Sequence, residues 1–175
     1  MNRVPAPRSL LVLLAFLAAG CLPDGQSRGG VQVGQEAPGF QAQTLEGEEV
    51  TLADYRGAPV LLNIWATWCP PCRVEIPELQ KLHESHGPLG LRVVGVSIDA
   101  AGAQGDVVEF AASLGVGYEI LLDVPGRSLP TFAFHGVPGT LLVDADGIIR
   151  WKHLGPVTAQ DPALVAALEE IFPGA

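Results

Sequence analysis

Two cysteines, Cys69 and Cys72, are separated only by Pro70 and Pro71 and follow an apolar stretch. A Cys-x-x-Cys pair can cycle between a dithiol and a disulfide when one sulfur is ionised as a thiolate. We expect a helix to begin at Pro70, whose N-terminal amides and dipole would lower the pKa of Cys69 below the ~8.5 of a free cysteine. Cys72 would lie one turn further along the same face. The pattern therefore predicts that Cys69 attacks a disulfide and that Cys72 resolves the mixed disulfide.

Such a pair can also be half of a zinc site or an inert structural disulfide. A tetrahedral zinc site needs further thiolate or imidazole ligands. The chain has one more cysteine, Cys21, and four histidines without ligand spacing, so no metal is expected. A disulfide that closes so short a loop adds little stability. Both alternatives are weaker than the redox role.

The residues around the pair predict a strand, a helix, a second strand and a second helix. Pro59 to Trp65 is a mostly continuous apolar run, typical of a strand covered on both faces. A helix from Pro70 to about His86 would end before Gly87-Pro88. A strand over Leu91–Asp99 and a helix over Asp106–Leu114 complete a parallel-sheet pattern.

Shorter elements flank this unit. Alternating residues in Phe40–Thr44 and Glu49–Leu52 predict a hairpin at a sheet edge, and Asp161-Pro162 predicts the start of a last helix. Three further strands are expected at Ile120–Asp123, Thr140–Asp144 and Ile148–His153. The chain has 175 residues, 48% hydrophobic, and no internal repeat, so one α/β domain is expected. The net charge of −9 offers no basic surface for nucleic acid.

The N-terminus has the features of a secretory signal. Met1 to Ser9 contains two arginines and no acid, and Leu10 to Ala19 is apolar but shorter than the roughly 20 residues of a membrane span. Ala18-Ala19-Gly20-Cys21 resembles a bacterial lipoprotein signal, which would be removed as residues 1–20 and leave lipidated Cys21 as a membrane anchor. An ordinary cleaved signal that leaves a free thiol is the alternative. Residues 21–30 are typical of a flexible tether, followed by a folded domain over 31–175.

The stretch W-A-T-W-C-P-P-C-R-V-E-I-P-E-L resembles the active site of thioredoxin-fold proteins. With the signal and the N-terminal hairpin, the chain is most similar to the membrane-tethered TlpA/ResA/DsbE reductases of cytochrome c maturation, over Val31 to Phe172. The resemblance implies a thioredoxin-like α/β fold, in which helices flank a central mixed sheet with an N-terminal β-hairpin. It implies no cofactor beyond the redox-active Cys69–Cys72 disulfide.

The same resemblance implies partners and a location. The clients would be proteins with disulfides or thiols, such as apocytochrome c, and an integral-membrane thiol donor would supply the electrons. The protein would be lipid-anchored on the extracytoplasmic side, periplasmic or in the cell envelope.

The resemblance also identifies Val137-Pro138 as the cis-proline loop opposite the dithiol, where the Val137 backbone pairs with an extended substrate segment. Leu129-Pro130-Thr131-Phe132 is a rival for this loop, but Pro138 directly precedes a predicted strand, as in the family. Trp68, Pro70 and Pro71 are expected to contact substrate beside the cysteines. Gly139 is smaller than the residue that the family often has there.

Proton transfer needs a further group. Thioredoxins have a buried aspartate on the central strand, where this chain has Asn63, which cannot take a proton. Glu75 matches a glutamate of TlpA/ResA-type proteins, and partial burial there would raise its pKa to suit acid–base work on Cys72. The alternative is a solvated first-turn acid. Pro77 is expected to kink the helix without a catalytic role.

Two other functions remain open. Val33 to Phe40 resembles the opening of the peroxiredoxin superfamily, which would make the protein a thiol peroxidase. Such enzymes have threonine three residues before the reactive cysteine, where this chain has Ala66. A copper-binding chaperone of the same fold is the second alternative. Those proteins typically use Cys-x-x-x-Cys with a distant histidine, a role for which His135 would be the candidate.

Overall fold

The computed structural model describes Met1 and residues 31–174. Apart from Met1, the expected signal, the tether over 21–30 and the expected lipidation site Cys21 lie outside the described residues. Within the described part of the chain, no helix has both the length and the apolar character needed to cross a membrane.

Seven strands form one mixed sheet in the order β2-β1-β5-β4-β3-β6-β7. The central strand β3 pairs in parallel with β4 and antiparallel with β6, and β4 pairs in parallel with β5. β1 and β2 pair antiparallel, with β2 at one edge of the sheet and β7 at the other. The strands are β1 (Gln41–Thr44), β2 (Glu49–Thr51), β3 (Val60–Trp65), β4 (Arg92–Ser97), β5 (Glu119–Leu122), β6 (Gly139–Val143) and β7 (Ile149–Leu154).

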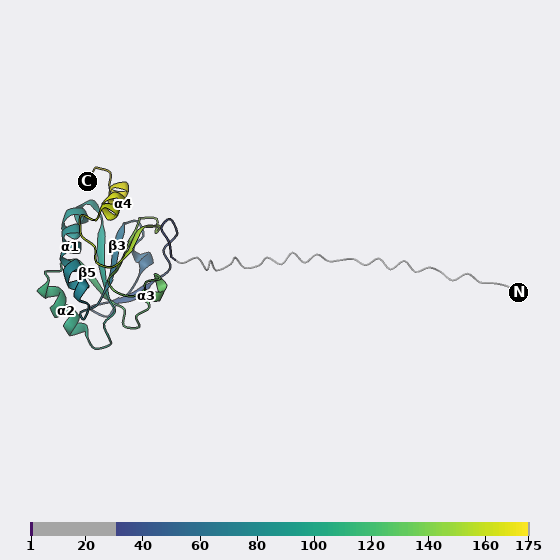
Figure 1. The fold of residues 1–175 in the computed structure, drawn as a ribbon. Coiled ribbons are helices and arrows are strands. Elements are labelled where there is room, and N and C mark those ends of the chain that lie inside the picture. The colour runs from purple at the N-terminus through teal and green to yellow at the C-terminus, as the bar shows by residue number, and fades with distance from the viewer. Residues whose placement is uncertain (2–30, 175) are drawn as a thin grey trace.

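Helices cover both faces of this sheet. Figure 1 shows α1 and α2 on one side and α3 on the other, with α4 near the end of the molecule that holds the C-terminus. The helices are α1 (Pro70–His86), α2 (Gln104–Ser113), α3 (Ser128–Thr131) and α4 (Pro162–Ile171), with 3₁₀ turns η1 (Leu52–Tyr55) and η2 (Gly87–Leu89). The thioredoxin-like architecture expected from the sequence is therefore present.

The strand expected over Leu91–Asp99 is observed as Arg92–Ser97, and two α-helices also differ from the sequence expectation. α2 begins at Gln104 rather than Asp106, because the Val107 amide already donates to the Ala103 carbonyl at 2.9 Å, and an acid is favourable within the first turn as well as before it. The short helix α3 contains Pro130 and was not expected. The carboxylate of Asp123 accepts the backbone N–H of Ser128 at 2.6 Å and thus caps its start.

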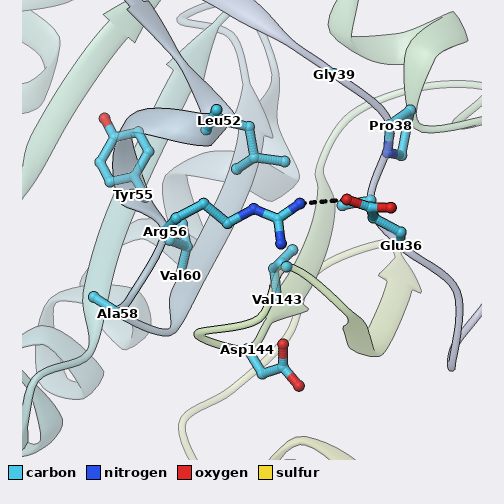
Figure 2. Close-up of a pocket in the computed structure, with 13 residues that line it drawn as sticks. Glu36, Pro38, Gly39, Leu52, Tyr55, Arg56, Ala58, Val60, Val143 and Asp144 are labelled. Carbon is cyan, nitrogen blue, oxygen red and sulfur yellow. Dashed lines mark hydrogen bonds and ion pairs between the residues drawn. The ribbon is translucent and has the colours of Figure 1, made fainter.

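The segment before β1 is fastened to the body of the protein by Arg56, which follows η1. Its guanidinium forms an ion pair with Glu36 and donates to the Asp146 carbonyl. Figure 2 shows this pair in a pocket of about 150 Å³, which Val60 also lines. Because Val60 begins β3 and the cysteines follow the other end of that strand, this pocket is remote from the dithiol.

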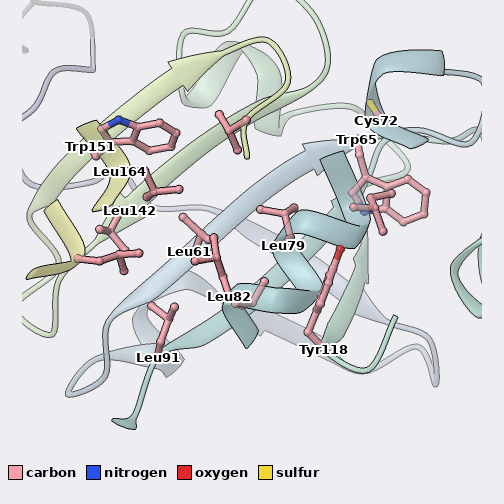
Figure 3. Packing of buried hydrophobic residues seen from close by; sticks show 14 of the residues in the cluster. Leu61, Trp65, Cys72, Leu79, Leu82, Leu91, Tyr118, Leu142, Trp151 and Leu164 are labelled. Atoms are coloured by element: carbon pink, nitrogen blue, oxygen red, sulfur yellow. The ribbon is translucent and has the colours of Figure 1, made fainter. Parts of the chain in front are cut away.

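The core has two layers because β3 is buried along its whole length. Leu61 and Trp65 pack with α1, α2 and α4 in the cluster of Figure 3, whereas Leu62 and Ile64 belong to a second cluster on the opposite face. Side chains alternate along a strand, so Asn63 lies on the same face as Leu61 and Trp65. The central strand thus directs one buried amide toward the helix that carries the cysteines.

Candidate active site

Cys69 and Cys72 form a disulfide at the junction of β3 and α1, with Cα atoms 5.4 Å apart. Cys69 is the N-cap of α1, and its Sγ accepts the backbone N–H of Cys72 at 3.3 Å. Prolines suit the first helical positions because their missing N–H groups would have no partner in the helix. This arrangement aims an amide and the positive end of the helix dipole at the Cys69 sulfur, so it favours a thiolate when the pair is reduced.

The two sulfurs differ in access. Cys69 is 4% exposed and Cys72 is fully buried. An apolar side chain is exposed next to Cys69, since Trp68 exposes 64% of its surface. Pro70 and Pro71 are exposed as well. A substrate that reaches the pair therefore meets an apolar surface and approaches Cys69 first.

The Val137–Pro138 peptide is cis, and Pro130 lies within α3. In the register of β3 and β6, Ile64 is opposite Gly139, so Pro138 lies at the end of β3 from which the cysteine loop departs. The Pro138 carbonyl accepts the Gly155 amide at 2.9 Å. Within residues 31–174, neither the N–H nor the C=O of Val137 takes part in a hydrogen bond with other backbone. That backbone is free to pair with an extended segment.

Gly139 follows this loop, and its surroundings are tightly packed. A Cβ at Gly139 would be 2.9 Å from the ring of Phe134, which is closer than real Cβ contacts allow. The aromatic ring thus fills the space that a larger residue would need. Phe134 accounts physically for the small residue that the sequence shows there.

Glu75 is completely buried on the inner side of α1. Its carboxylate accepts hydrogen bonds from Asn63 Nδ2 at 2.9 Å, from Thr140 Oγ1 at 3.1 Å and from the Val157 amide at 3.3 Å. Burial raises the pKa of Glu75 from 4.5 to about 7, although the three donors act in the opposite direction. The alternative of a solvated first-turn acid is therefore wrong, because this face of α1 packs onto the sheet.

Asn63 and Thr140 complete a small polar network. Thr140 Oγ1 accepts from Asn63 Nδ2 at 2.8 Å while it donates to Glu75. Asn63 occupies the place expected for a buried acid but acts as a donor to one. The sequence pattern did not predict Thr140 as a member of the site. Thr140 lies opposite Asn63 only through the register of β3 and β6 in the folded sheet.

His135 and Tyr118 make no side-chain hydrogen bond to this network within residues 31–174. α1 continues past Pro77 as one element. His135 is exposed. Tyr118 is buried, and burial together with the Glu75 charge raises its pKa. Among the described residues, no group of three or more His, Cys, Asp or Glu side chains is arranged to hold a metal ion.

Comparison with known proteins agrees with this geometry. Residues 33–152 match the model of the AhpC/TSA family. The chain belongs to the AhpC/TSA family. Among its relatives, Thioredoxin-like protein YneN of Bacillus subtilis is 38% identical over 75% of this chain and 77% of its own length. Thiol-disulfide oxidoreductase ResA of Geobacillus thermodenitrificans is 31% identical over 95% of both chains.

A solved structure supports the same assignment. A thiol:disulfide interchange protein from Bacteroides sp. superposes with a TM-score of 0.71 at 28% identity and covers 83% of this chain and 93% of its own. Together with the Cys69–Cys72 pair, these relatives identify this AhpC/TSA-family chain as a TlpA/ResA/DsbE-like protein dithiol–disulfide oxidoreductase of thioredoxin fold.

Proposed function

We propose that the protein reduces disulfides of client proteins outside the cytoplasm, with Cys69 as the attacking sulfur and Cys72 as the resolving one. The observation that supports this most directly is the position of Cys69 at the N-cap of α1, where its sulfur accepts the Cys72 amide and retains some exposure. The second sulfur is buried, so it is protected from external disulfides but remains next to the first.

The reaction requires two exchanges. The Cys69 thiolate attacks one sulfur of the client disulfide, which forms a mixed disulfide and releases the other client sulfur as a thiolate that takes up a proton. Cys72 then loses its proton and attacks Cys69 Sγ, which releases the second client sulfur. The client gains two electrons and two protons, and the protein is left with the Cys69–Cys72 disulfide. A thiol donor must reduce that disulfide before the next cycle.

Glu75 is the proposed proton acceptor for Cys72. It follows Cys72 by almost one turn of α1, and its pKa of about 7 allows it to take and return a proton near neutral pH. A carboxyl with the ordinary pKa of 4.5 would be too weak a base for a buried thiol. The polar donors from Asn63 and Thr140 keep the ionised form accessible despite burial.

The client and the location are also proposals. The exposed apolar surface of Trp68 suits an extended protein segment rather than a small molecule, and so does the Val137 backbone, which has no backbone partner within residues 31–174. Apocytochrome c is the client that the family resemblance suggests, with electrons from an integral-membrane thiol donor. The signal-like N-terminus with Cys21 supports a lipid-anchored protein on the extracytoplasmic side.

Trapping of the mixed disulfide tests this function. Cys72→Ser should retain client proteins covalently on Cys69 in the native host, and thiol treatment should release them for identification. Cys69→Ser, the matched control, should retain none. With insulin as substrate, either substitution should abolish catalytic reduction. Peroxide turnover that survives Cys72→Ser would instead indicate the peroxidase. If both variants still reduced insulin, the dithiol mechanism would be refuted.

A further inference from the structure

A buried acid, Asp99, holds the loop that leads from β3 to Cys69. Its Oδ1 accepts the Thr67 hydroxyl at 2.6 Å, and its Oδ2 accepts the Thr67 backbone N–H at 3.0 Å. The Ser97 hydroxyl donates to the same Oδ2 at 2.7 Å. The carboxylate therefore joins the end of β4 to the loop that ends β3.

These contacts begin where the sheet ends. The last backbone bond between the two strands runs from the Ile98 amide to the Trp65 carbonyl at 3.0 Å. One step further along, the Thr67 amide has the Asp99 side chain as its partner. The carboxylate thus extends the pairing of the two strands by one more attachment, at the end of β3 from which the cysteine loop departs.

Asp99 depends on these donors. It is only 6% exposed, and within the described residues it has no salt bridge with a basic side chain. A buried carboxylate is costly unless donors satisfy its oxygens, so its position and that of Thr67 are strongly coupled. The loop cannot drift without leaving a buried charge short of hydrogen bonds.

The held loop determines where the Cys69 sulfur lies. After Thr67 the chain turns, with the Cys69 amide donating to the Ala66 carbonyl at 3.2 Å, and Cys69 then takes the extended N-cap conformation. We propose that Asp99 is a positioning residue, which fixes Thr67 so that the Cys69 sulfur stays aligned with the Cys72 amide. This role rests on the proposed function only in that Cys69 is the attacking sulfur.

Thr67 separates this role from a charge effect of Asp99. Thr67→Val removes the hydroxyl donor but keeps the carboxylate charge, and Thr67→Ser restores the hydroxyl. In Asp99→Asn, the amide offers one acceptor oxygen and turns an NH₂ group toward donors. A loosened loop makes the Cys69 thiolate less stable, whereas loss of a negative charge alone makes it more stable.

The experiment measures the alkylation rate of Cys69 by iodoacetamide across pH in the reduced full-length chain, with the modified cysteine located by mass spectrometry. Thr67→Val and Asp99→Asn should both shift the midpoint of the profile upward by about one pH unit, a tenfold change in the ionisation constant. Thr67→Ser should stay close to the wild type. Asp123→Asn is the matched control. Asp123 is also buried and accepts hydrogen bonds from backbone amides, but those amides lie at the start of α3.

The outcomes are distinguishable. A downward shift in Asp99→Asn with an unchanged Thr67→Val would show that the charge acts alone and would overturn the positioning role. An equal upward shift in Asp123→Asn would reduce the effect to general loss of stability and would also overturn it. If Asp99→Asn does not fold, the Thr67→Val and Thr67→Ser pair decides. A wild-type midpoint near the ~8.5 of a free cysteine would contradict the proposed function itself.

Discussion

Asn63 on the central strand donates to the carboxylate of Glu75 on α1 across 2.9 Å, in a region where both side chains are completely buried. The central strand therefore carries an amide where the resemblance to thioredoxins predicts an acid, and the buried acid lies on α1 instead. This exchange keeps one titratable group on the inner side of the dithiol helix. The pKa of that group reflects two opposed effects, because burial raises it and the hydrogen-bond donors lower it.

Replacement of Glu75 by glutamine should change how stability depends on pH. The folded pKa of Glu75 is about 7 and its ordinary value is 4.5, so the folded state holds the proton more tightly. The stability that the Glu75 carboxyl contributes to the fold is fully present below about pH 4.5 and is lost as pH rises through 7. The wild type should therefore lose about 2–3 kcal/mol of unfolding free energy between these limits relative to Glu75→Gln.

Denaturant unfolding of both proteins at several pH values between 4.5 and 8 provides the measurement. The difference between the two curves removes the effect of every other titrating group, because both chains share them. Parallel curves would mean that Glu75 ionises freely in the folded protein, contrary to its burial.

Local sequence signals predicted most of the elements that hold this site. The apolar run of β3 and the prolines of the Cys-Pro-Pro-Cys stretch fixed the strand and the start of α1 to within a residue, because such signals depend on neighbouring residues only. The family resemblance supplied the choice of Val137-Pro138. The short helix α3 was not predicted, because its cap comes from Asp123, which precedes it by several residues in a stretch that resembles a loop.

Long-range contacts could not be predicted in the same way. Thr140 is 77 residues from Asn63 in the chain, and only the pairing of β3 with β6 brings their side chains together. The complete burial of Glu75 likewise depends on how α1 lies on the sheet. The sequence suggested an acid near Cys72, but its donors and its pKa follow from tertiary packing.

Thr140→Val should raise the pKa of Glu75 further. The substitution keeps the side-chain shape but removes a hydroxyl that donates to the carboxylate at 3.1 Å and thereby favours its charged form. We expect a rise of about one pH unit, visible by NMR titration of the Glu75 carboxyl in the reduced protein. Thr140→Ser keeps the hydroxyl and should titrate like the wild type. A lower pKa in Thr140→Val would contradict the role of this hydrogen bond.

Cys21→Ser tests the proposed anchor. If Cys21 is lipidated, the variant should move from the membrane fraction to the soluble fraction when cells of the native host are separated. Stable attachment takes two or more acyl chains, so loss of the modified cysteine should release the protein. Mass spectrometry of the wild-type N-terminal peptide provides an independent check, because the lipid adds mass to Cys21. An unmodified Cys21 in the mature chain would exclude this anchor.

Gly139→Ala should destabilise the cis-proline loop, whereas Gly136→Ala should not. A Cβ at Gly139 would meet the Phe134 ring at 2.9 Å, but a Cβ at Gly136 meets no heavy atom within 4 Å. Overpacking of this kind typically costs about 1–3 kcal/mol. Because Gly139 directly follows Pro138, displacement of Phe134 or of the strand should also slow insulin reduction. The combination with Phe134→Leu, which relieves the contact, should recover part of both losses. Equal behaviour of the two alanine variants would show that the Phe134 ring does not restrict this position.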